Sequence, residues 1–254
     1  MPSPDTRPAW TADALAHDPH TDADKAGKVR RMFDAIAPSY DLNNRVHSLW
    51  QDVYWRRAAV RMANVQQGDA VVDVACGTGD LTQAFARSPA GSVLGVDYTR
   101  GMLRRAQIKR TTHARRDKIT YVEGDAMALP LADACSDVVS IAFGIRNVAD
   151  PAKAVREFAR VLRPGGRVVV LEFGVPRSRL VRWFNDVYCG KVMPRTATLL
   201  ARDTSGAYAY LPRSVRMFHS PEQMTRMLEA AGFTQICHRS MSLGICLCFV
   251  GTRT

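Results

Sequence analysis

The stretch Val71-Val72-Asp73-Val74-Ala75-Cys76-Gly77-Thr78-Gly79-Asp80 decides how the rest of the chain is interpreted. A run of mainly β-branched apolar residues leads into a turn with two glycines, and a helical pattern begins at Leu81. This order is typical of a strand, a tight turn and the N-terminus of a helix. Glycines in such a turn let the backbone approach a ligand where a Cβ would collide. The stretch therefore predicts a cofactor site at the end of a strand.

Strands and helices are expected to alternate around this turn, which is typical of an α/β fold with a parallel sheet and helices on both faces. The patterns predict strands at 70–75, 92–97, 119–123, 136–142 and 167–173, and helices at 80–88, 99–114 and 151–162. A last helix begins at Ser220-Pro221, as N-cap and first-turn proline, and ends before Gly232. Strands at 234–240 and 243–250 are expected to close the sheet as an antiparallel hairpin.

The remaining segments predict additions to this sheet. Residues 1–25 mix Pro, Asp, Thr and Ala without periodicity and predict a disordered tail, while residues 26–254 are expected to form a single domain. Within that domain, 26–66 predicts a helical cap, with a first helix ended by Pro38, a polar loop at 39–44 and a second helix at 48–63. The basic and aromatic segment 176–219 predicts a mostly helical lid.

Length and composition place the chain among ordinary globular proteins. It has 254 residues, of which 46% are hydrophobic. No apolar run approaches the ~20 residues of a membrane-spanning helix, and the polar start lacks the apolar core of a secretory signal. The six cysteines form no CxxC pair and the six histidines no HxxxH pair. We therefore expect a cytoplasmic protein without a bound metal.

The charge is unevenly distributed along the chain. The formal net charge is +11, but residues 1–24 hold five Asp and one Arg and so carry −4, which leaves +15 on the remainder. Such a body favours an anionic partner, either nucleic acid or the headgroups of a membrane. The alternative is a basic surface that meets only solvent.

Three classes of cofactor use a strand, a glycine turn and a helix. A P-loop needs GxxxxGK[ST], which this chain lacks. A dinucleotide site needs GxGxxG, but Thr82 stands at the third glycine position, and Asp80 would repel a pyrophosphate at the helix start. S-adenosylmethionine carries no phosphate, and its zwitterionic end tolerates a nearby acid. The pattern also resembles the class I methyltransferase signature, so we predict an S-adenosylmethionine site that includes Asp73, Gly77, Thr78 and Gly79.

Acids at the next two strand ends support this cofactor. Asp97 stands about 20 residues beyond the turn, where a carboxylate can accept hydrogen bonds from both ribose hydroxyls. Asp125 follows the third strand, where it can accept a hydrogen bond from the adenine amino group. Tyr98 and Ala126 adjoin these acids and Ala142 ends the fourth strand, and we assign all three to the same cofactor site.

Four segments resemble the UbiE/MenG family, the C-methyltransferases of ubiquinone and menaquinone biosynthesis. They are Met32-Phe33-Asp34…Ala37…Ser39-Tyr40-Asp41…Asn44, Cys76-Gly77-Thr78-Gly79-Asp80-Leu81-Thr82, Phe143-Gly144-Ile145-Arg146-Asn147-Val148 and Leu171-Glu172-Phe173. The resemblance implies a class I methyltransferase that methylates a ring carbon of a reduced polyprenyl quinol. The implied acceptors are demethylmenaquinol and 2-methoxy-6-polyprenyl-1,4-benzoquinol.

Such a reaction needs an electron-rich ring, because deprotonating a phenol, with a pKa of about 10, makes its ring carbons more nucleophilic. Arg146 and Asn147 follow the fourth strand at the sheet edge where ligands bind. We expect Arg146 to stabilise the phenolate or to hold a water that acts as base, and Asn147 to orient the oxygen. The alternative is that Arg146 pairs with an acid and Asn147 caps a turn.

Further candidates lie in the cap and the lid. Tyr40 is expected to contact the methionine end of the cofactor or to close over the site. Asp203 matches an acid of the family's lid and is a second candidate base, with a salt bridge as the alternative role. His219 could move a proton near neutral pH, but a lone histidine before an N-cap is more often a surface residue.

Other functions stay open at this point. The chain could methylate another small-molecule phenol or natural product, and its basic body leaves an RNA methyltransferase as a remoter alternative. A silent binding subunit is disfavoured by the acids and by the Arg146-Asn147 pair. The predicted partners are a polyprenyl quinol and, less directly, an anionic membrane at its inner face and a second copy of the chain, without nucleic acid.

Overall fold

The computed structural model describes residues 8–193, 195–197 and 205–254. Within them a seven-stranded sheet has the order β3-β2-β1-β4-β5-β7-β6. β1 to β5 run parallel, whereas β7 runs antiparallel to both of its neighbours. The strands are β1 (Ala70–Val74), β2 (Ser92–Asp97), β3 (Ile119–Glu123), β4 (Ser136–Ala142), β5 (Leu162–Phe173), β6 (Phe233–Met241) and β7 (Cys246–Arg253). The predicted α/β class with a C-terminal antiparallel hairpin is confirmed.

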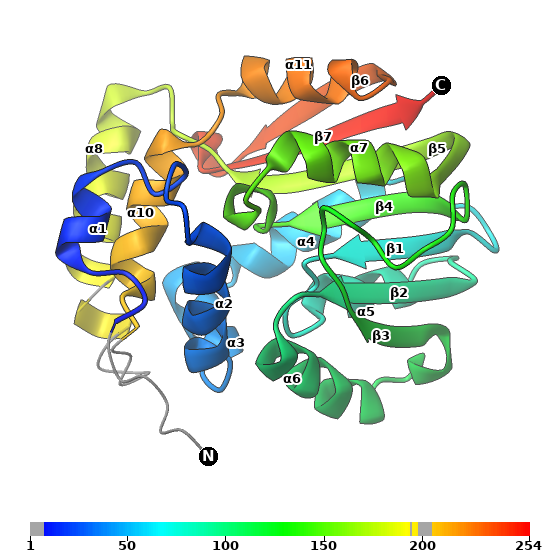
Figure 1. Cartoon of the computed structure of the whole chain (residues 1–254), viewed down its shortest axis with the longest axis horizontal. Helices are drawn as coiled ribbons and strands as arrows, with labels where there is room; N and C mark the ends of the chain where they lie inside the picture. The colour runs from blue at the N-terminus through cyan, green and yellow to red at the C-terminus, as the bar shows by residue number, and fades with distance from the viewer. Residues whose placement is uncertain (1–7, 194, 198–204) are drawn as a thin grey trace.

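Helices cover both faces of this sheet and gather at one end of it (Figure 1). The α-helices are α1 (Ala12–Ala16), α2 (Lys25–Ile36), α3 (Tyr40–His47), α4 (Gln51–Met62), α5 (Asp80–Ala86), α6 (Arg100–Thr111), α7 (Pro151–Val161), α8 (Arg179–Val187), α10 (Ala207–Met217) and α11 (Pro221–Ala230). Short 3-10 helices are η1 (Arg116–Lys118), η2 (Ile145–Asn147) and η4 (Ser242–Gly244), and η3 (Tyr188–Val192) is a π-helix.

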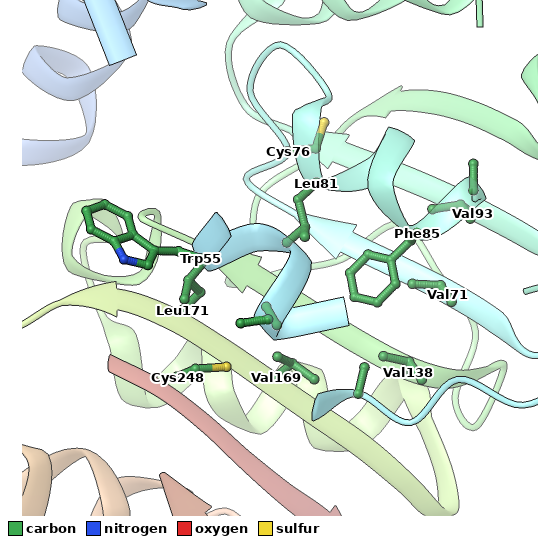
Figure 2. Close-up of a cluster of buried hydrophobic side chains, with 14 of the residues drawn as sticks. Trp55, Val71, Cys76, Leu81, Phe85, Val93, Val138, Val169, Leu171 and Cys248 are labelled. Carbon is green, nitrogen blue, oxygen red and sulfur yellow. The ribbon is translucent and has the colours of Figure 1, made fainter. Parts of the chain in front are cut away.

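The alternation of side chains along β1 divides the core into two layers. Val71 lies beside Phe85 of α5 on one face, in a cluster that also includes Trp55 of α4 (Figure 2). Val72 and Val74 belong to the cluster on the opposite face, which α7 and α11 cover. The short apolar run before the glycine turn is therefore buried on both faces of the sheet, and this packing holds the start of the turn in place.

The cap and the lid lie beyond the carboxyl ends of the parallel strands. In Figure 1, α2 and α3 of the cap and α8 and α10 of the lid stand at the end towards which β1 and β4 point. The described part of the lid is helical, as predicted. α11 begins with the predicted cap at Ser220, whose hydroxyl accepts from the Gln223 N–H, and has proline at its first position.

The polar loop predicted at 39–44 is instead part of α3. That helix has no apolar stripe, because the residues at its i, i+3 and i+7 positions are Tyr40, Asn43 and His47, which face a cavity. Hydrophobic periodicity cannot detect a helix whose inner face is polar and aromatic. The cap therefore consists of three helices rather than the predicted two.

The structure also differs from the disordered tail predicted for residues 1–25. Residues 1–7 lie outside the described residues, but 12–16 form α1, and its N-cap Thr11 accepts from the Ala14 N–H. Trp10 is only 2% exposed and stacks on Tyr210 of the lid. A single aromatic residue whose partner lies 200 positions away leaves no periodic pattern in the sequence.

Candidate active site

Two adjoining cavities lie at the carboxyl ends of the parallel strands. The first has a volume of about 130 Å³ and the second of about 660 Å³. Phe33, Tyr40 and Phe143 line both cavities and form their common wall. Seven of the ten residues predicted to bind the cofactor line the first cavity: Tyr40, Gly77, Asp97, Tyr98, Asp125, Ala126 and Ala142.

Asp97 is the last residue of β2, and its carboxylate binds the backbone of the glycine turn. Its Oδ2 accepts from the Gly77 N–H at 2.7 Å and its Oδ1 from the Thr99 N–H at 2.8 Å. Burial raises the pKa of this carboxyl, while the two backbone N–H groups favour its charged form. A carboxylate offers about four acceptor positions. Two backbone bonds therefore leave capacity for a pair of ligand hydroxyls.

The two glycines of the turn have different roles. Gly77 has a φ of +57°, and a Cβ added there would have Tyr40 Cε1 as its nearest neighbour, at 4.0 Å. That side chain would project between the turn and Tyr40, both of which line the first cavity. A Cβ on Gly79 would instead lie 2.2 Å from the hydroxyl of Tyr121 in β3. Gly77 thus keeps the cavity open, and Gly79 lets the turn pack on the core.

Asp73, Thr78 and Gly79 line neither cavity. Asp73 is 1% exposed, and its two oxygens accept from the hydroxyls of Ser140 and Thr82 at 2.8 and 2.6 Å. Burial raises its pKa to about 6. The hydroxyl of Thr78 donates to Asp41 at 2.5 Å. We therefore assign these residues to the scaffold that joins β1, β4, α5 and the cap.

A group of charged residues surrounds Asp80, the residue that follows the glycine turn. Asp80 accepts from Lys109 Nζ at 2.5 Å and from Arg45 Nη2 at 2.7 Å. Burial raises the pKa of Asp80, but the positive charges of Arg56 and Lys109 outweigh burial and bring it to about 2. This acid is therefore ionised and bound to the cap, so α3, α5 and α6 are tied together beside the cavity.

The second cavity is large and lies between the cap and the lid. It is lined by helices α2, α3 and α4, the end of β5 and the described parts of the lid. Apolar and aromatic side chains form much of its wall: Met32, Ile36, Leu49, Trp55, Phe173, Val175, Tyr188, Met193, Tyr208, Tyr210, Leu211 and Val215. A cavity of this size and lining suits an elongated apolar ligand with a polar head.

Arg146 lies in η2 and lines the second cavity. Its Nη1 donates to Glu172 Oε1 at 2.7 Å and to the Phe143 carbonyl at 2.8 Å. The pairing with an acid that the sequence left as an alternative is thus present. Among the described residues, no hydrogen bond uses its Nη2. The guanidinium is consequently fixed in place and keeps donor capacity for a ligand.

Asn147 lines the first cavity next to Arg146. Its Nδ2 donates to the Phe143 carbonyl at 3.1 Å, and the hydroxyl of Tyr210 donates to its Oδ1 at 2.9 Å. The same Phe143 carbonyl thus accepts from both site residues. Phe143 has a φ of +57°, a costly conformation for a bulky residue, which suggests that its position at the cavity wall is functional.

The other candidates are placed differently. Asp203 lies outside the described residues. His219 is exposed in the connection before α11 and lines neither cavity. Within the described residues, no group of three His, Cys, Asp or Glu side chains is arranged to hold a metal ion.

Three site residues have roles that the sequence did not reveal. Glu172 carries the counter-charge for Arg146, Tyr210 fixes Asn147, and Ser214 lies with its hydroxyl 3.4 Å from Arg146 Nε. Two signals pointed to Glu172: it interrupts the apolar run of β5 at its carboxyl end, and it lies in the family-like segment Leu171-Glu172-Phe173. Tyr210 and Ser214 come from α10 and carried none.

Comparison with known proteins agrees with this geometry. A family model described as the ubiE/COQ5 methyltransferase family matches residues 21–253. The chain belongs to this family. It is 42% identical to a demethylmenaquinone methyltransferase of Thermus thermophilus over 87% of this chain and 100% of that protein. It is 39% identical to the ubiquinone/menaquinone biosynthesis C-methyltransferase UbiE of Geobacter sulfurreducens, over 91% of this chain and 90% of that protein.

The fold has relatives among solved structures as well. A SAM-dependent methyltransferase of Thermotoga maritima superposes with a TM-score of 0.62 at 19% identity, over 89% of this chain and 100% of that chain. Membership of the ubiE/COQ5 family confirms the predicted enzyme class, a methyltransferase that uses S-adenosylmethionine. Residues 8–20 precede the region that the family model matches.

Proposed function

We propose that this enzyme transfers a methyl group from S-adenosylmethionine to a ring carbon of a polyprenyl quinol. The acceptor is demethylmenaquinol, 2-methoxy-6-polyprenyl-1,4-benzoquinol or both. The observation that carries the proposal is the common wall of Phe33, Tyr40 and Phe143. At this wall the smaller cavity, which includes the carboxylates of Asp97 and Asp125, adjoins a much larger cavity lined mainly by apolar side chains. The larger cavity suits a quinol ring that carries an isoprenoid tail.

The first cavity fits the cofactor by its hydrogen-bond acceptors and by the open space at its glycine turn. Asp97 has acceptor capacity for the ribose hydroxyls, and Asp125, which already accepts from the Met127 N–H at 2.8 Å, has a second oxygen for the adenine amino group. Gly77 supplies the open cradle, with Tyr40, Tyr98, Ala126 and Ala142 around it. When bound, S-adenosylmethionine supplies an electrophilic methyl group on sulfur.

Arg146 and Asn147 of η2 are proposed to bind the quinol, which is the methyl acceptor, and to activate its ring. Arg146 places a fixed positive charge at the second cavity, where it stabilises the quinol as a phenolate and so raises the nucleophilicity of the ring carbon. Asn147 keeps one amide N–H for an oxygen near the common wall. Asp203 stays a predicted base. Quinol rather than quinone is the substrate, because the oxidised ring is itself an electrophile.

An anionic membrane is the proposed source of this substrate. Of the described helices, none is long and apolar enough to cross a bilayer. Six exposed large apolar residues, here called the docking surface, belong to segments that contribute residues to the lining of the second cavity: Leu49, Trp50, Leu180, Trp183, Phe184 and Leu243. We propose that the protein works at the inner face of the membrane and binds it through this surface.

Contacts between distant segments connect the docking surface. Trp55 Nε1 donates to Ser242 Oγ at 2.8 Å, which joins η4 and Leu243 to α4. The Gly174 N–H donates to the Ile245 carbonyl at 2.9 Å, which joins η4 to the segment before α8. The exposed Arg177, Arg179 and Arg182 flank the apolar residues of α8. Aromatic residues beside arginines favour the interface of an anionic bilayer.

The acceptor is tested by complementation and by direct assay. The gene is expressed in two hosts, one blocked in menaquinone methylation and one in ubiquinone methylation, and their quinones are analysed. In parallel, the purified protein receives labelled S-adenosylmethionine and membranes of each host under reducing conditions. Label in a quinone fraction is expected, and its absence from both would overturn the proposal. Nucleic acid is not among the proposed partners, and a homodimer stays a prediction for light scattering.

A further inference from the structure

Residues 8–20, here called the N-terminal strap, lie against lid helix α10. The indole of Trp10 stacks on the ring of Tyr210, with 4.6 Å between centroids and 22° between planes. Arg213 of α10 donates to the Ala16 carbonyl at 3.0 Å, and His20 Nε2 lies 2.8 Å from the Ser214 carbonyl. The strap therefore contacts α10 at both of its ends. The strap also precedes residues 21–253, the region that the family model matches.

The chain that follows the strap is anchored on the site itself. Lys25, the first residue of α2, is 2% exposed and donates from Nζ to the Val148 carbonyl at 2.6 Å. Val148 directly follows Asn147 and lines the first cavity. The strap, α10, η2 and the start of α2 thus form a chain of contacts that passes through Asn147.

The hydrogen bonds of Asn147 fix which way its amide faces. The Phe143 carbonyl can only accept, so the nitrogen of the Asn147 amide must face it at 3.1 Å. The amide oxygen then faces Tyr210, whose hydroxyl must donate. Burial raises the pKa of Tyr210 to about 12, so the donor proton is retained at physiological pH. With these two bonds made, one amide N–H remains for a ligand.

We propose that Tyr210 is a positioning residue for Asn147, and that the N-terminal strap, through Trp10, holds Tyr210 in place. Asn147 then enters each turnover already oriented, without spending binding energy on ordering its amide. The effect on turnover rests on the proposed quinol methylation. The mechanical part, in which the strap orders α10, does not.

Tyr210→Phe tests the positioning role, because it removes the hydroxyl and keeps the stacked ring. We expect kcat to fall about fivefold to tenfold, the effect of one lost hydrogen bond in the transition state, with the quinol KM and the affinity for S-adenosylhomocysteine nearly unchanged. The side-chain amide NMR signal of Asn147 should shift. Tyr54→Phe, on the exposed side of α4, is the matched control and should change neither kcat nor the Asn147 amide signal. Unchanged kcat and amide signal in Tyr210→Phe would overturn the proposal.

Trp10→Ala tests the strap, with hydrogen exchange of residues 207–217 as a readout that needs no substrate. These amides should exchange faster than in wild type, whereas Trp50→Ala, which removes an exposed tryptophan, should leave them unchanged. Adding Tyr210→Phe to Trp10→Ala should lower kcat little further, because both act through Asn147. Wild-type protection of α10 in Trp10→Ala would contradict the strap. If wild type methylates no quinol, the proposed function fails while exchange and the amide signal still decide this proposal.

Discussion

Asp97 both supports the glycine turn and faces the first cavity. Asp97→Ala removes an acceptor for two backbone N–H groups and, in the proposed cofactor site, for the ribose hydroxyls. We expect calorimetry with S-adenosylhomocysteine to show binding weaker by about 1.5–3 kcal/mol, the range for hydrogen bonds to a charged group. Glu123→Ala removes a half-exposed acid at the end of the neighbouring strand, which is bound to Arg100. Equal affinities for the two variants would contradict the assignment.

Asp80 makes the stability of the chain sensitive to acid. Its pKa of about 2 lies below its ordinary value of 3.8, so its stabilising contribution is complete above about pH 4 and is lost as pH falls towards 2. The shift corresponds to about 2 kcal/mol. Urea unfolding across this range should show a shallower loss of stability in Asp80→Asn than in wild type. Asp117→Asn, in the exposed η1, should keep the wild-type slope, and a wild-type slope in Asp80→Asn would refute the assignment.

Some of the residues predicted to bind the cofactor line the first cavity, and others lie inside the sheet. Asp97 and Asp125 follow strand ends, and in a parallel sheet that position alone brings side chains to the ligand edge. Asp73 belongs to the same sequence pattern but lies inside β1, where the pleat directs it towards Thr82 and Ser140. The pleat sets the face that a strand residue takes, but the motif alone does not show which of its residues will reach a cavity in the folded sheet.

The joint between η2 and β5 depends on the buried ion pair of Arg146 and Glu172. Arg146→Ala leaves Glu172 buried without its partner, and we expect a loss of about 3–5 kcal/mol in the free energy of unfolding. Lower activity in that variant would therefore have two causes. The double variant Arg146→Met with Glu172→Leu removes both charges at similar volume and should recover most of the stability.

Turnover in that double variant separates the two causes. If Arg146 stabilises the phenolate, the recovered fold should still methylate at least about a hundredfold more slowly, as expected for loss of a transition-state charge partner. Urea unfolding and single-turnover rates measure the two quantities on the same sample. Recovery of rate together with stability would restrict Arg146 to a structural role.

Elements whose signal is local were predicted, and elements formed by distant contacts were not. The strands of the sheet and the capped start of α11 follow from short apolar runs and from Ser220-Pro221. α3 was missed because its inner face is polar towards a cavity, and α1 because the segment around it is held by Trp10 and Tyr210. In both cases the stabilising partner is a lid or a cavity that exists only after the chain has folded.

At the scale of the whole molecule, the docking surface and the basic charge of the body predict binding to anionic membranes. Leu49 and Leu243 are 77% and 76% exposed, and α8 adds the exposed Leu180, Trp183 and Phe184. We expect the protein to float with vesicles of phosphatidylcholine mixed with phosphatidylglycerol, and more weakly with phosphatidylcholine alone. Binding to the mixed vesicles should decrease in about 1 M salt, where the Debye length falls to about 3 Å.

Removing the aromatic pair of α8 isolates the contribution of the docking surface. Trp183→Ala with Phe184→Ala should lower the partition coefficient on mixed vesicles at least about tenfold, because each ring contributes more than 1 kcal/mol when it leaves water. Ile108→Ala is the matched control, since Ile108 is 62% exposed on α6, away from the second cavity. Methylation of a short-chain quinol in detergent should stay at the wild-type rate in the double variant, because neither ring lines a cavity. Equal partitioning of the double variant, the control and wild type would show that the membrane is bound elsewhere, and loss of the detergent activity would place the pair in the site rather than on its rim.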